Sequence, residues 1–158
     1  WYFFRRDVSY LFCIRVKKLN MEYISENIID LELIGKKIIK YSNKKSNIFT
    51  FEGEMGVGKT ALIKIILKHL KVKDLVKSPT FSIVNEYLTS DNKIIYHFDF
   101  FRIKDKIEVI NIGFEDYLDS SNYCFIEWPN SIKNLLPNDI NKIMMEYVSE
   151  TKRKIIID

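Results

Sequence analysis

Residues 53–60 read Gly53-Glu54-Met55-Gly56-Val57-Gly58-Lys59-Thr60 and contain three of the five glycines in this chain of 158 residues. The spacing G-x-x-x-x-G-K-[ST] is typical of a loop that binds nucleotide phosphates. The preceding run, 47–51, is β-branched and aromatic and predicts a buried strand, whereas the following run, 61–70, predicts a helix. The motif is specific when it lies between a strand and a helix, so this stretch predicts an α/β fold with a nucleotide site.

Each residue type in this motif has a chemical reason to be there. Glycines let the backbone curl until successive N–H groups point at phosphate oxygens, and the positive end of the next helix assists them. Lys59 is expected to reach the β- and γ-phosphates, and the hydroxyl of Thr60 to ligate Mg²⁺. The alternative is a chance glycine turn before a helix. The nucleotide ligands expected from the motif are Gly53, Gly56, Val57, Gly58, Lys59, Thr60 and Ala61.

Length and composition indicate one globular domain with a sizeable core. The two cysteines, Cys13 and Cys124, cannot form a disulfide framework, and Cys124 lies in an apolar run where a free thiol packs as a small hydrophobe. No segment approaches the roughly 18 apolar residues of a membrane span. We therefore expect a cytoplasmic protein that does not act on a membrane.

The net charge of +4 belongs to the N-terminal stretch. Residues 1–20 carry five basic side chains and one acidic one, whereas residues 21–158 carry 20 of each. The stretch begins with Trp1, and Met21 follows it directly. We expect residues 1–20 to be a non-native or disordered extension and 21–158 to be the folded domain. The alternative is a basic aromatic arm that contacts RNA or a partner.

The remaining segments alternate between helical and strand-like patterns. Ser25 is a candidate N-cap for a helix over 26–41. Two strands, 82–89 and 93–100, are separated by a turn-forming segment and predict a hairpin. Further on, the patterns predict short helices at 105–110 and 115–118, a strand at 122–126, a helical turn at 132–135, and paired strands at 140–148 and 154–157. Parallel strands near the nucleotide plus antiparallel hairpins predict a three-layer, P-loop NTPase-like fold with a mixed central sheet.

Two acidic residues follow predicted strands directly. Asp99 comes after 94–98 and Glu127 after 123–126. Hydrolysis needs an acid that holds the metal or orients water, and ligands of α/β sheets gather at the carboxyl ends of the strands. Both acids are therefore candidates for the site, unless one of them only caps a loop or pairs with Arg102. His97 shares a strand face with Asp99 and is expected to be a hydrogen-bonded structural residue.

Two further segments are candidates to border the nucleotide. In Ser78-Pro79-Thr80-Phe81, the hydroxyl of Thr80 or Ser78 could reach metal or phosphate, or the segment could be a proline turn with a cap. Trp128 is a candidate to stack on the nucleotide or close the pocket; the alternative is a buried core tryptophan.

The ordered motifs resemble the bacterial ATPase subunit of tRNA threonylcarbamoyladenosine synthesis, the TsaE type. The resemblance covers about residues 21–158 and none of 1–20. Many proteins share the phosphate loop, but its combination with S-P-T-F, H-x-D-x-x-R and E-W-P is specific; Phe101 stands where tyrosine is common. The motifs are 53–60, Ser78-Pro79-Thr80-Phe81, Asn85-Glu86-Tyr87, His97-Phe98-Asp99-Phe100-Phe101-Arg102, Gly113 and Glu127-Trp128-Pro129.

The resemblance implies a Mg²⁺-dependent ATPase. Its implied partner is a complex of two proteins with actin-like folds that transfers threonylcarbamoyl to adenosine 37 of tRNAs, so tRNA is met through that complex. In this family, ATP turnover resets the complex between cycles. By position, Lys59 and Thr60 would bind nucleotide and metal, Glu127 would ligate Mg²⁺, and Asp99 would serve hydrolysis or the metal. The residues implied to lie near the nucleotide also include Trp128, Ser25 and Arg153.

Two other functions are compatible with the residues. A small-molecule kinase of the P-loop class surrounds the moving phosphoryl group with positive donors, often arginines, and residues 21–158 contain two arginines, Arg102 and Arg153. A non-catalytic ATP-gated adaptor would need the same residues as a partner-dependent ATPase. A GTP switch is disfavoured, because the chain has neither N-K-x-D nor D-x-x-G.

Overall fold

The computed structural model describes residues 20–42 and 46–158. Residues 1–19, which make up nearly all of the predicted N-terminal extension, lie outside the described residues. In chain order the elements are β1 (Met21–Ser25), α1 (Ile28–Ser42), β2 (Ile48–Gly53), α2 (Lys59–His69), β3 (Val84–Leu88), β4 (Ile94–Asp99), α3 (Lys106–Asn111), α4 (Phe114–Asp119), β5 (Tyr123–Glu127), η1 (Pro129–Leu135), β6 (Asn141–Tyr147) and β7 (Arg153–Ile157).

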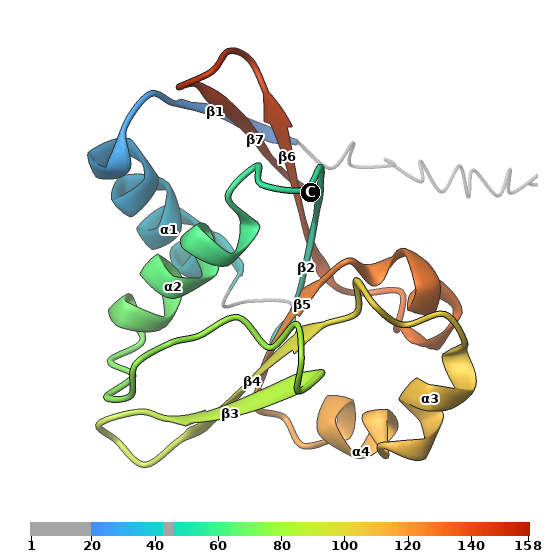
Figure 1. Ribbon diagram of the computed structural model, residues 1–158. Coiled ribbons are helices and arrows are strands. Elements are labelled where there is room, and N and C mark those ends of the chain that lie inside the picture. Colours follow the sequence, from blue (N-terminus) through green and yellow to red (C-terminus); the bar gives the residue numbers. More distant parts are fainter. Residues whose placement is uncertain (1–19, 43–45) are drawn as a thin grey trace, which may run out of the picture.

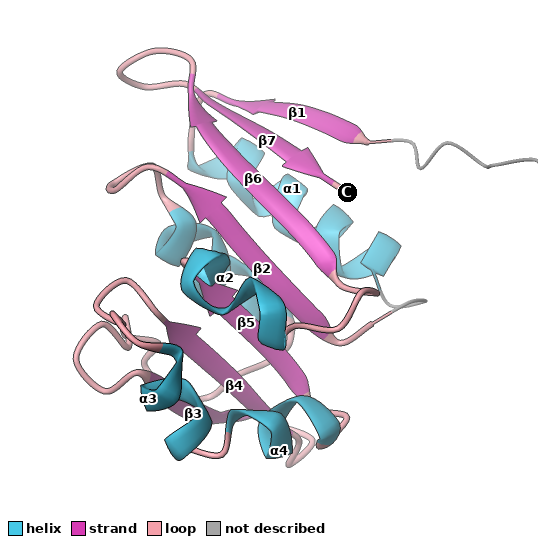
Figure 2. Cartoon of the chain, turned by 90° about the vertical axis from the view of Figure 1, so that its right-hand side faces the viewer, coloured by secondary structure: helices cyan, strands magenta, loops and turns pink. Residues whose placement is uncertain are grey.

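The strands form one mixed sheet of seven in the order β1-β7-β6-β2-β5-β4-β3 (Figure 2). At its centre β2 runs parallel to β5 and β6, and β4 runs parallel to β5. The pairs β3–β4, β6–β7 and β1–β7 are antiparallel. The predicted mixed α/β sheet is therefore confirmed, and so are its two hairpins.

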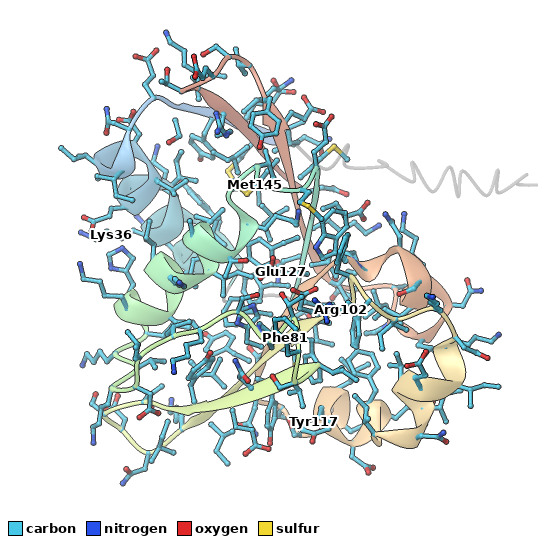
Figure 3. All side chains as sticks on the ribbon, in the orientation of Figure 1. Lys36, Phe81, Arg102, Tyr117, Glu127 and Met145 are labelled. Atoms are coloured by element: carbon cyan, nitrogen blue, oxygen red, sulfur yellow. The ribbon has the colours of Figure 1, made fainter. Side chains whose placement is uncertain are left out.

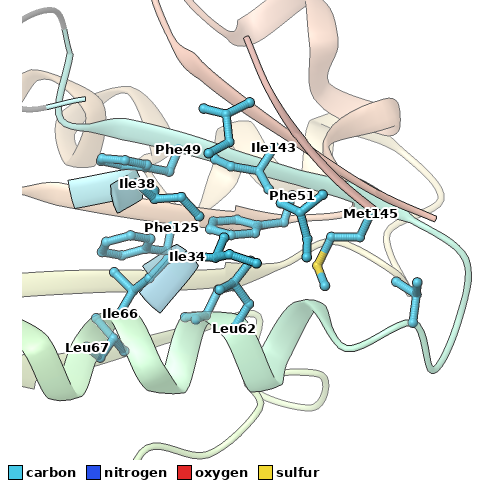
Figure 4. Close-up of a cluster of buried hydrophobic side chains, with 14 of the residues drawn as sticks. Ile34, Ile38, Phe49, Phe51, Leu62, Ile66, Leu67, Phe125, Ile143 and Met145 are labelled. Atoms are coloured by element: carbon cyan, nitrogen blue, oxygen red, sulfur yellow. The ribbon is translucent and has the colours of Figure 1, made fainter. Parts of the chain in front are cut away.

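Helices cover both faces of the sheet, which gives three layers (Figure 1). On one face α1 and α2 pack against the central strands around the stacked rings of Phe49 and Phe125, whose centroids are 4.9 Å apart. Gly35 allows this packing, because a Cβ there would lie 2.9 Å from Cγ2 of Ile65. Figure 4 shows this cluster, whose labelled members are Ile34, Ile38, Phe49, Phe51, Leu62, Ile66, Leu67, Phe125, Ile143 and Met145.

A second cluster lies under α3, α4 and η1 on the opposite face. Side chains alternate between the faces of a strand, so Phe125 joins the first cluster while Cys124 and Ile126 join the second. Strands buried on both faces read as continuous apolar runs, which is why 122–126 was predictable as a strand. The rings of Phe98 and Phe114 meet edge to face here, with centroids 5.1 Å apart.

The N-terminal part of the fold corrects the prediction. Ser25 is not the N-cap of the first helix; it is the last residue of β1, an edge strand that pairs with β7. The cap is Asn27, whose Oδ1 accepts hydrogen bonds from the N–H groups of Ile29 and Asp30. The hydroxyl of Ser25 instead donates to the carbonyl of Asn27. Both residue types cap helices well, and strand pairing decides between them.

The parallel strands β2, β5 and β4 bring three chain segments to one edge of the sheet. β2 ends at Gly53, β5 at Glu127 and β4 at Asp99. Position 53 needs glycine, because φ is +146° and a Cβ would collide with the carbonyl oxygen of Met145 on the neighbouring strand β6. In residues 20–42 and 46–158, no helix is both long and apolar enough to cross a bilayer.

Candidate functional site

The glycine loop, residues 53–60, connects β2 directly to the first residue of α2. Gly58 precedes the helix with φ +110°, a conformation that side chains rarely adopt. Two loop carbonyls are held from the β6–β7 side. Tyr147 Oη donates to the carbonyl of Met55 at 3.2 Å, and Arg153 Nε donates to that of Val57 at 3.1 Å.

Lys59 is buried within the curl of this loop. Its Nζ donates to the carbonyls of Gly53 at 2.7 Å and Glu54 at 2.8 Å, and it lies 3.8 Å from the centre of the Trp128 ring. Burial lowers the pKa of Lys59 because it penalises the charged form, while the nearby carboxylates of Glu127 and Asp99 act in the opposite direction. The loop thus holds a buried amine within the electrostatic influence of two acids.

Glu127 joins the glycine loop to the end of β5. The hydroxyl of Thr60 is within hydrogen-bond distance of both carboxylate oxygens, at 2.8 Å from Oε1 and 2.9 Å from Oε2. From the other side, Nε2 of His97 lies 2.9 Å from Oε1. His97 and Glu127 are both almost fully buried. The burial of His97 agrees with its expected structural role.

Asp99 is anchored by a different segment. The hydroxyl of Thr80 donates to Oδ2 at 2.6 Å, and the hydroxyl of Ser78 contacts that of Thr80 at 2.7 Å. The N–H of Phe101 donates to Oδ1 at 2.9 Å. Asp99 therefore does cap the turn after β4, one of the alternatives raised above. Among the described residues it forms no ion pair with Arg102.

These groups line a pocket of about 470 Å³. Nine of the residues predicted from the sequence border it: Gly56, Gly58, Lys59, Thr60, Ala61, Thr80, Asp99, Glu127 and Trp128. The pocket is also lined by Met55, Ser78, Phe101 and Arg102. The structure therefore gathers the glycine loop, both acids and the 78–81 segment around one cavity.

The other four predicted residues lie outside that lining. Gly53 is at the end of β2, and Val57 turns its side chain into the core. Ser25 pairs with Arg153 across β1 and β7. Arg153 turns its guanidinium to backbone carbonyls, including that of Val57, and over the ring of Tyr147 at 4.2 Å.

Three lining residues were not predicted as site residues: Met55, Phe101 and Arg102. Met55 occupies a variable position of the glycine motif, which carries no chemical signal. Arg102 and Phe101 belong to the H-x-D-x-x-R motif, which could have indicated them. The guanidinium of Arg102 lies 4.0 Å from the centre of the Phe81 ring. Figure 3 labels Phe81 and Arg102 together with Glu127, which lines the pocket along with Arg102.

The oxygen atoms in this pocket suit a hard cation. Mg²⁺ prefers oxygen ligands and is usually held by one or two carboxylates together with substrate phosphates and water. Thr60, Glu127 and Asp99 supply a hydroxyl and two carboxylates at the pocket wall. Within the described part of the chain, no group of three or more histidines, cysteines or acids could hold a metal. One hydroxyl and two carboxylates fit a metal that is held together with phosphate oxygens.

Known proteins are similar to most of this chain. The sequence model of the family described as threonylcarbamoyl adenosine biosynthesis protein TsaE matches residues 25–155. Proteins named tRNA threonylcarbamoyladenosine biosynthesis protein TsaE share 31% identity over 135 residues in Haemophilus influenzae, covering 83% of this chain and 84% of that protein. In Aquifex aeolicus the identity is 34% over 142 residues, covering 87% and 98%. In Rickettsia felis it is 36% over 118 residues, covering 74% and 68%.

The fold also has a solved counterpart. The crystal structure of YdiB from Bacillus subtilis superposes with a TM-score of 0.70 and covers 88% of this chain and 84% of that chain. The identity is 24%, so this likeness supports the seven-stranded α/β architecture alone. The family match spans the glycine loop, both acids, the β3–β4 hairpin and all but the last two residues of the β6–β7 hairpin. The chain belongs to the TsaE family of threonylcarbamoyl adenosine biosynthesis proteins.

Proposed function

We propose that this chain is a Mg²⁺-dependent ATPase subunit in the synthesis of threonylcarbamoyladenosine at position 37 of tRNAs. Its family membership supports the pathway, since its relatives are named tRNA threonylcarbamoyladenosine biosynthesis proteins. A P-loop NTPase-like fold for residues 21–158 is supported by two features. The glycine loop lies between a strand and a helix, and the parallel strands beside it end in acids. The chemistry of the pocket supports ATP and Mg²⁺ as cofactors.

The glycine loop is the proposed triphosphate site. Its backbone N–H groups and the N-terminal end of α2 would face the phosphates. Lys59 would neutralise the β- and γ-phosphates from within the loop, where it is already buried. Trp128 packs against Lys59 and would border the nucleotide on the side of β5.

The observation that carries the proposal is the pair of contacts between Thr60 and Glu127. The Thr60 hydroxyl at the start of α2 lies 2.8 Å from Oε1 and 2.9 Å from Oε2 of Glu127 at the end of β5. The two residues are 67 positions apart in sequence. These two groups would hold Mg²⁺ together with phosphate oxygens. Asp99, one strand further along the sheet edge, would orient the attacking water or share the metal.

The proposed partners follow from the family. They are two subunits with actin-like folds that form the threonylcarbamoyl-transfer complex, and tRNA is met through them. Residues 21–158 carry equal numbers of basic and acidic side chains. This balance gives no electrostatic reason for the folded part to grip tRNA by itself, and it agrees with a subunit that works through protein contacts.

A small-molecule kinase is less well supported by the pocket. Of the two arginines in residues 21–158, Arg102 lines the pocket, but Arg153 directs its guanidinium to backbone carbonyls. A phosphoryl-transfer lid commonly uses several arginines to neutralise the moving group. An ATP-gated adaptor would need ATP binding alone to support tRNA modification, whereas the ATPase would need hydrolysis as well. A test of the proposal must therefore separate binding from hydrolysis.

The experiment combines the chain with its purified transfer complex, tRNA and ATP labelled on the γ-phosphate. We expect label in inorganic phosphate and several rounds of modified adenosine 37 per complex. Label on a metabolite would instead support the kinase. The Glu127→Gln variant separates the remaining two functions. Repeated modification without ATP hydrolysis would support the adaptor, whereas arrest after about one round supports the ATPase.

A further inference from the structure

A buried imidazole stands directly behind Glu127. His97 lies on β4 and is fully buried, and its Nε2 is 2.9 Å from Oε1 of Glu127. The same Oε1 is contacted by the hydroxyl of Thr60 at 2.8 Å. Thr60, Glu127 and His97 thus form a continuous row of polar groups from the glycine loop into the core.

The acceptor decides which nitrogen of the ring carries the proton. A carboxylate only accepts hydrogen bonds, so Nε2 of His97 must donate to Oε1 of Glu127. Nδ1 is the other ring nitrogen of His97. It is buried and has no hydrogen-bond partner among the described residues.

A histidine at this position carries a cost for fold stability. Nδ1 is buried without a partner, and leaving a polar atom in that state costs free energy. Ile95, which shares the strand face of His97, is fully buried and apolar, so an apolar side chain would suit this face of the strand. The contact with Glu127 is the gain that offsets this cost.

We propose that His97 is a positioning residue for the metal-binding carboxylate of Glu127. The terminal torsion of a glutamate is broad and confines the carboxylate weakly. With Oε1 held by His97, the plane of the carboxylate is restrained, and Oε2 would be positioned toward the metal. Among the described residues, the hydroxyl of Thr60 is the contact of Oε2. The inference rests on the proposed Mg²⁺·ATP function of the pocket.

The magnitude of such an effect is known in general. Hydrogen-bond partners of metal ligands commonly contribute about 10- to 100-fold to metal affinity or activity. His97 would act through Glu127 and would not touch the nucleotide. Its loss should therefore weaken metal binding and leave metal-free nucleotide binding unchanged.

Three variants of the full chain separate positioning from packing. His97→Gln keeps an N–H donor near the place of Nε2. His97→Asn places its amide near Nδ1 instead, and His97→Phe keeps a ring without a donor. Mn²⁺ binding is followed by electron paramagnetic resonance in the presence of a non-hydrolysable ATP analogue. Analogue binding in excess EDTA is the matched control.

We expect His97→Phe and His97→Asn to bind Mn²⁺ about tenfold more weakly than the wild type or worse, and His97→Gln to stay within about threefold. Analogue affinity in EDTA should be equal in all four proteins. Wild-type Mn²⁺ affinity in a folded His97→Phe protein would overturn the inference. If that variant does not fold, equal Mn²⁺ affinities of His97→Asn and His97→Gln overturn it.

The same titration tests the proposed function separately. If the wild type binds no Mn²⁺ with the analogue present, the proposed Mg²⁺·ATP site fails, and the inference fails with it. If the wild type binds Mn²⁺ and the His97 variants match it, the inference alone fails.

Discussion

Asp99 and Glu127 are paired residues at the carboxyl ends of the parallel strands β4 and β5. The two carboxylates accept hydrogen bonds from different segments. Glu127 accepts one from Thr60 of the glycine loop, whereas Asp99 accepts one from Thr80 of the segment that follows α2. Glu127 is thereby tied to the glycine loop, and Asp99 to the 78–81 segment.

Neutralising either acid should separate ATP binding from hydrolysis. Asp99→Asn and Glu127→Gln keep the size of the side chain, so the phosphates should still bind the loop. Hydrolysis should fall about 100-fold or more, because metal or water loses its negative partner. Phosphate release in single turnovers measures hydrolysis, and calorimetry measures ATP binding.

The matched control for this pair is Glu115→Gln. Glu115 is an exposed acid on α4 that does not line the pocket, so its loss should leave both measurements unchanged. Normal turnover in Asp99→Asn and in Glu127→Gln would mean that neither acid takes part in the reaction.

The β6–β7 hairpin should control the shape of the glycine loop. Arg153 Nε and Tyr147 Oη hold the carbonyls of Val57 and Met55. In a planar trans peptide unit, the carbonyl and the N–H of the next residue point in opposite directions. Holding the carbonyls of Met55 and Val57 away from the pocket therefore turns the following N–H groups toward it. Losing a hydrogen bond to a charged group costs about 1.5–3 kcal/mol, so Arg153→Lys should weaken ATP binding by roughly tenfold or more.

Hydrogen exchange distinguishes this bracing from direct contact with the nucleotide. Without ATP, the amides of residues 55–58 should exchange faster in Arg153→Lys than in the wild type. Tyr147→Phe, which removes one hydroxyl, should show a smaller effect of the same sign. Unchanged exchange together with weakened ATP binding would assign Arg153 to the nucleotide itself, as the family resemblance implies.

The thiol of Cys124 should be inert in the folded protein. Burial raises the pKa of Cys124 from 9.0 to about 12. In a Cys13→Ser background, Ellman's reagent at pH 8 should therefore react only after unfolding, because the thiolate is the reactive form. A rapid reaction in the native protein would show that the β5 core opens to solvent.

The same shift has a defined effect on stability. Between pH 9.0 and about 12 the unfolded chain loses the Cys124 proton while the folded chain keeps it. The free energy of unfolding should therefore fall as the pH rises through this range. Urea midpoints should decline less steeply with pH in Cys124→Ala. Equal slopes would show that the pKa of Cys124 is not raised by folding.

Features with a local cause could be predicted from the sequence. The glycine loop is specified by residue spacing, and the strand before Glu127 by a continuous apolar run. The closeness of Asp99 and Glu127 followed from a general rule, since both acids end strands that were expected to be parallel. These strands indeed pair with Asp99 opposite Glu127.

Features that depend on distant pairing could not be predicted. β1 is a short edge strand, and Met21 pairs with Ile157 at the opposite end of the chain. Met21–Ser25 is only five residues long, and a serine before a helical pattern favours an N-cap at Ser25. The stacking of Arg102 on Phe81 and the turn of Arg153 toward Val57 depend on side-chain packing that sequence spacing does not reveal.

Residues 53–60 should bind the triphosphate of ATP, and Lys59 should be indispensable for that binding. Calorimetric titration of Mg²⁺·ATP into the wild type, Lys59→Ala and Lys64→Ala measures it. Lys64 is exposed on the same helix, so its variant removes an equal charge outside the pocket. We predict binding by the wild type and by Lys64→Ala, and no measurable binding by Lys59→Ala. Equal affinity in all three proteins would contradict the claim.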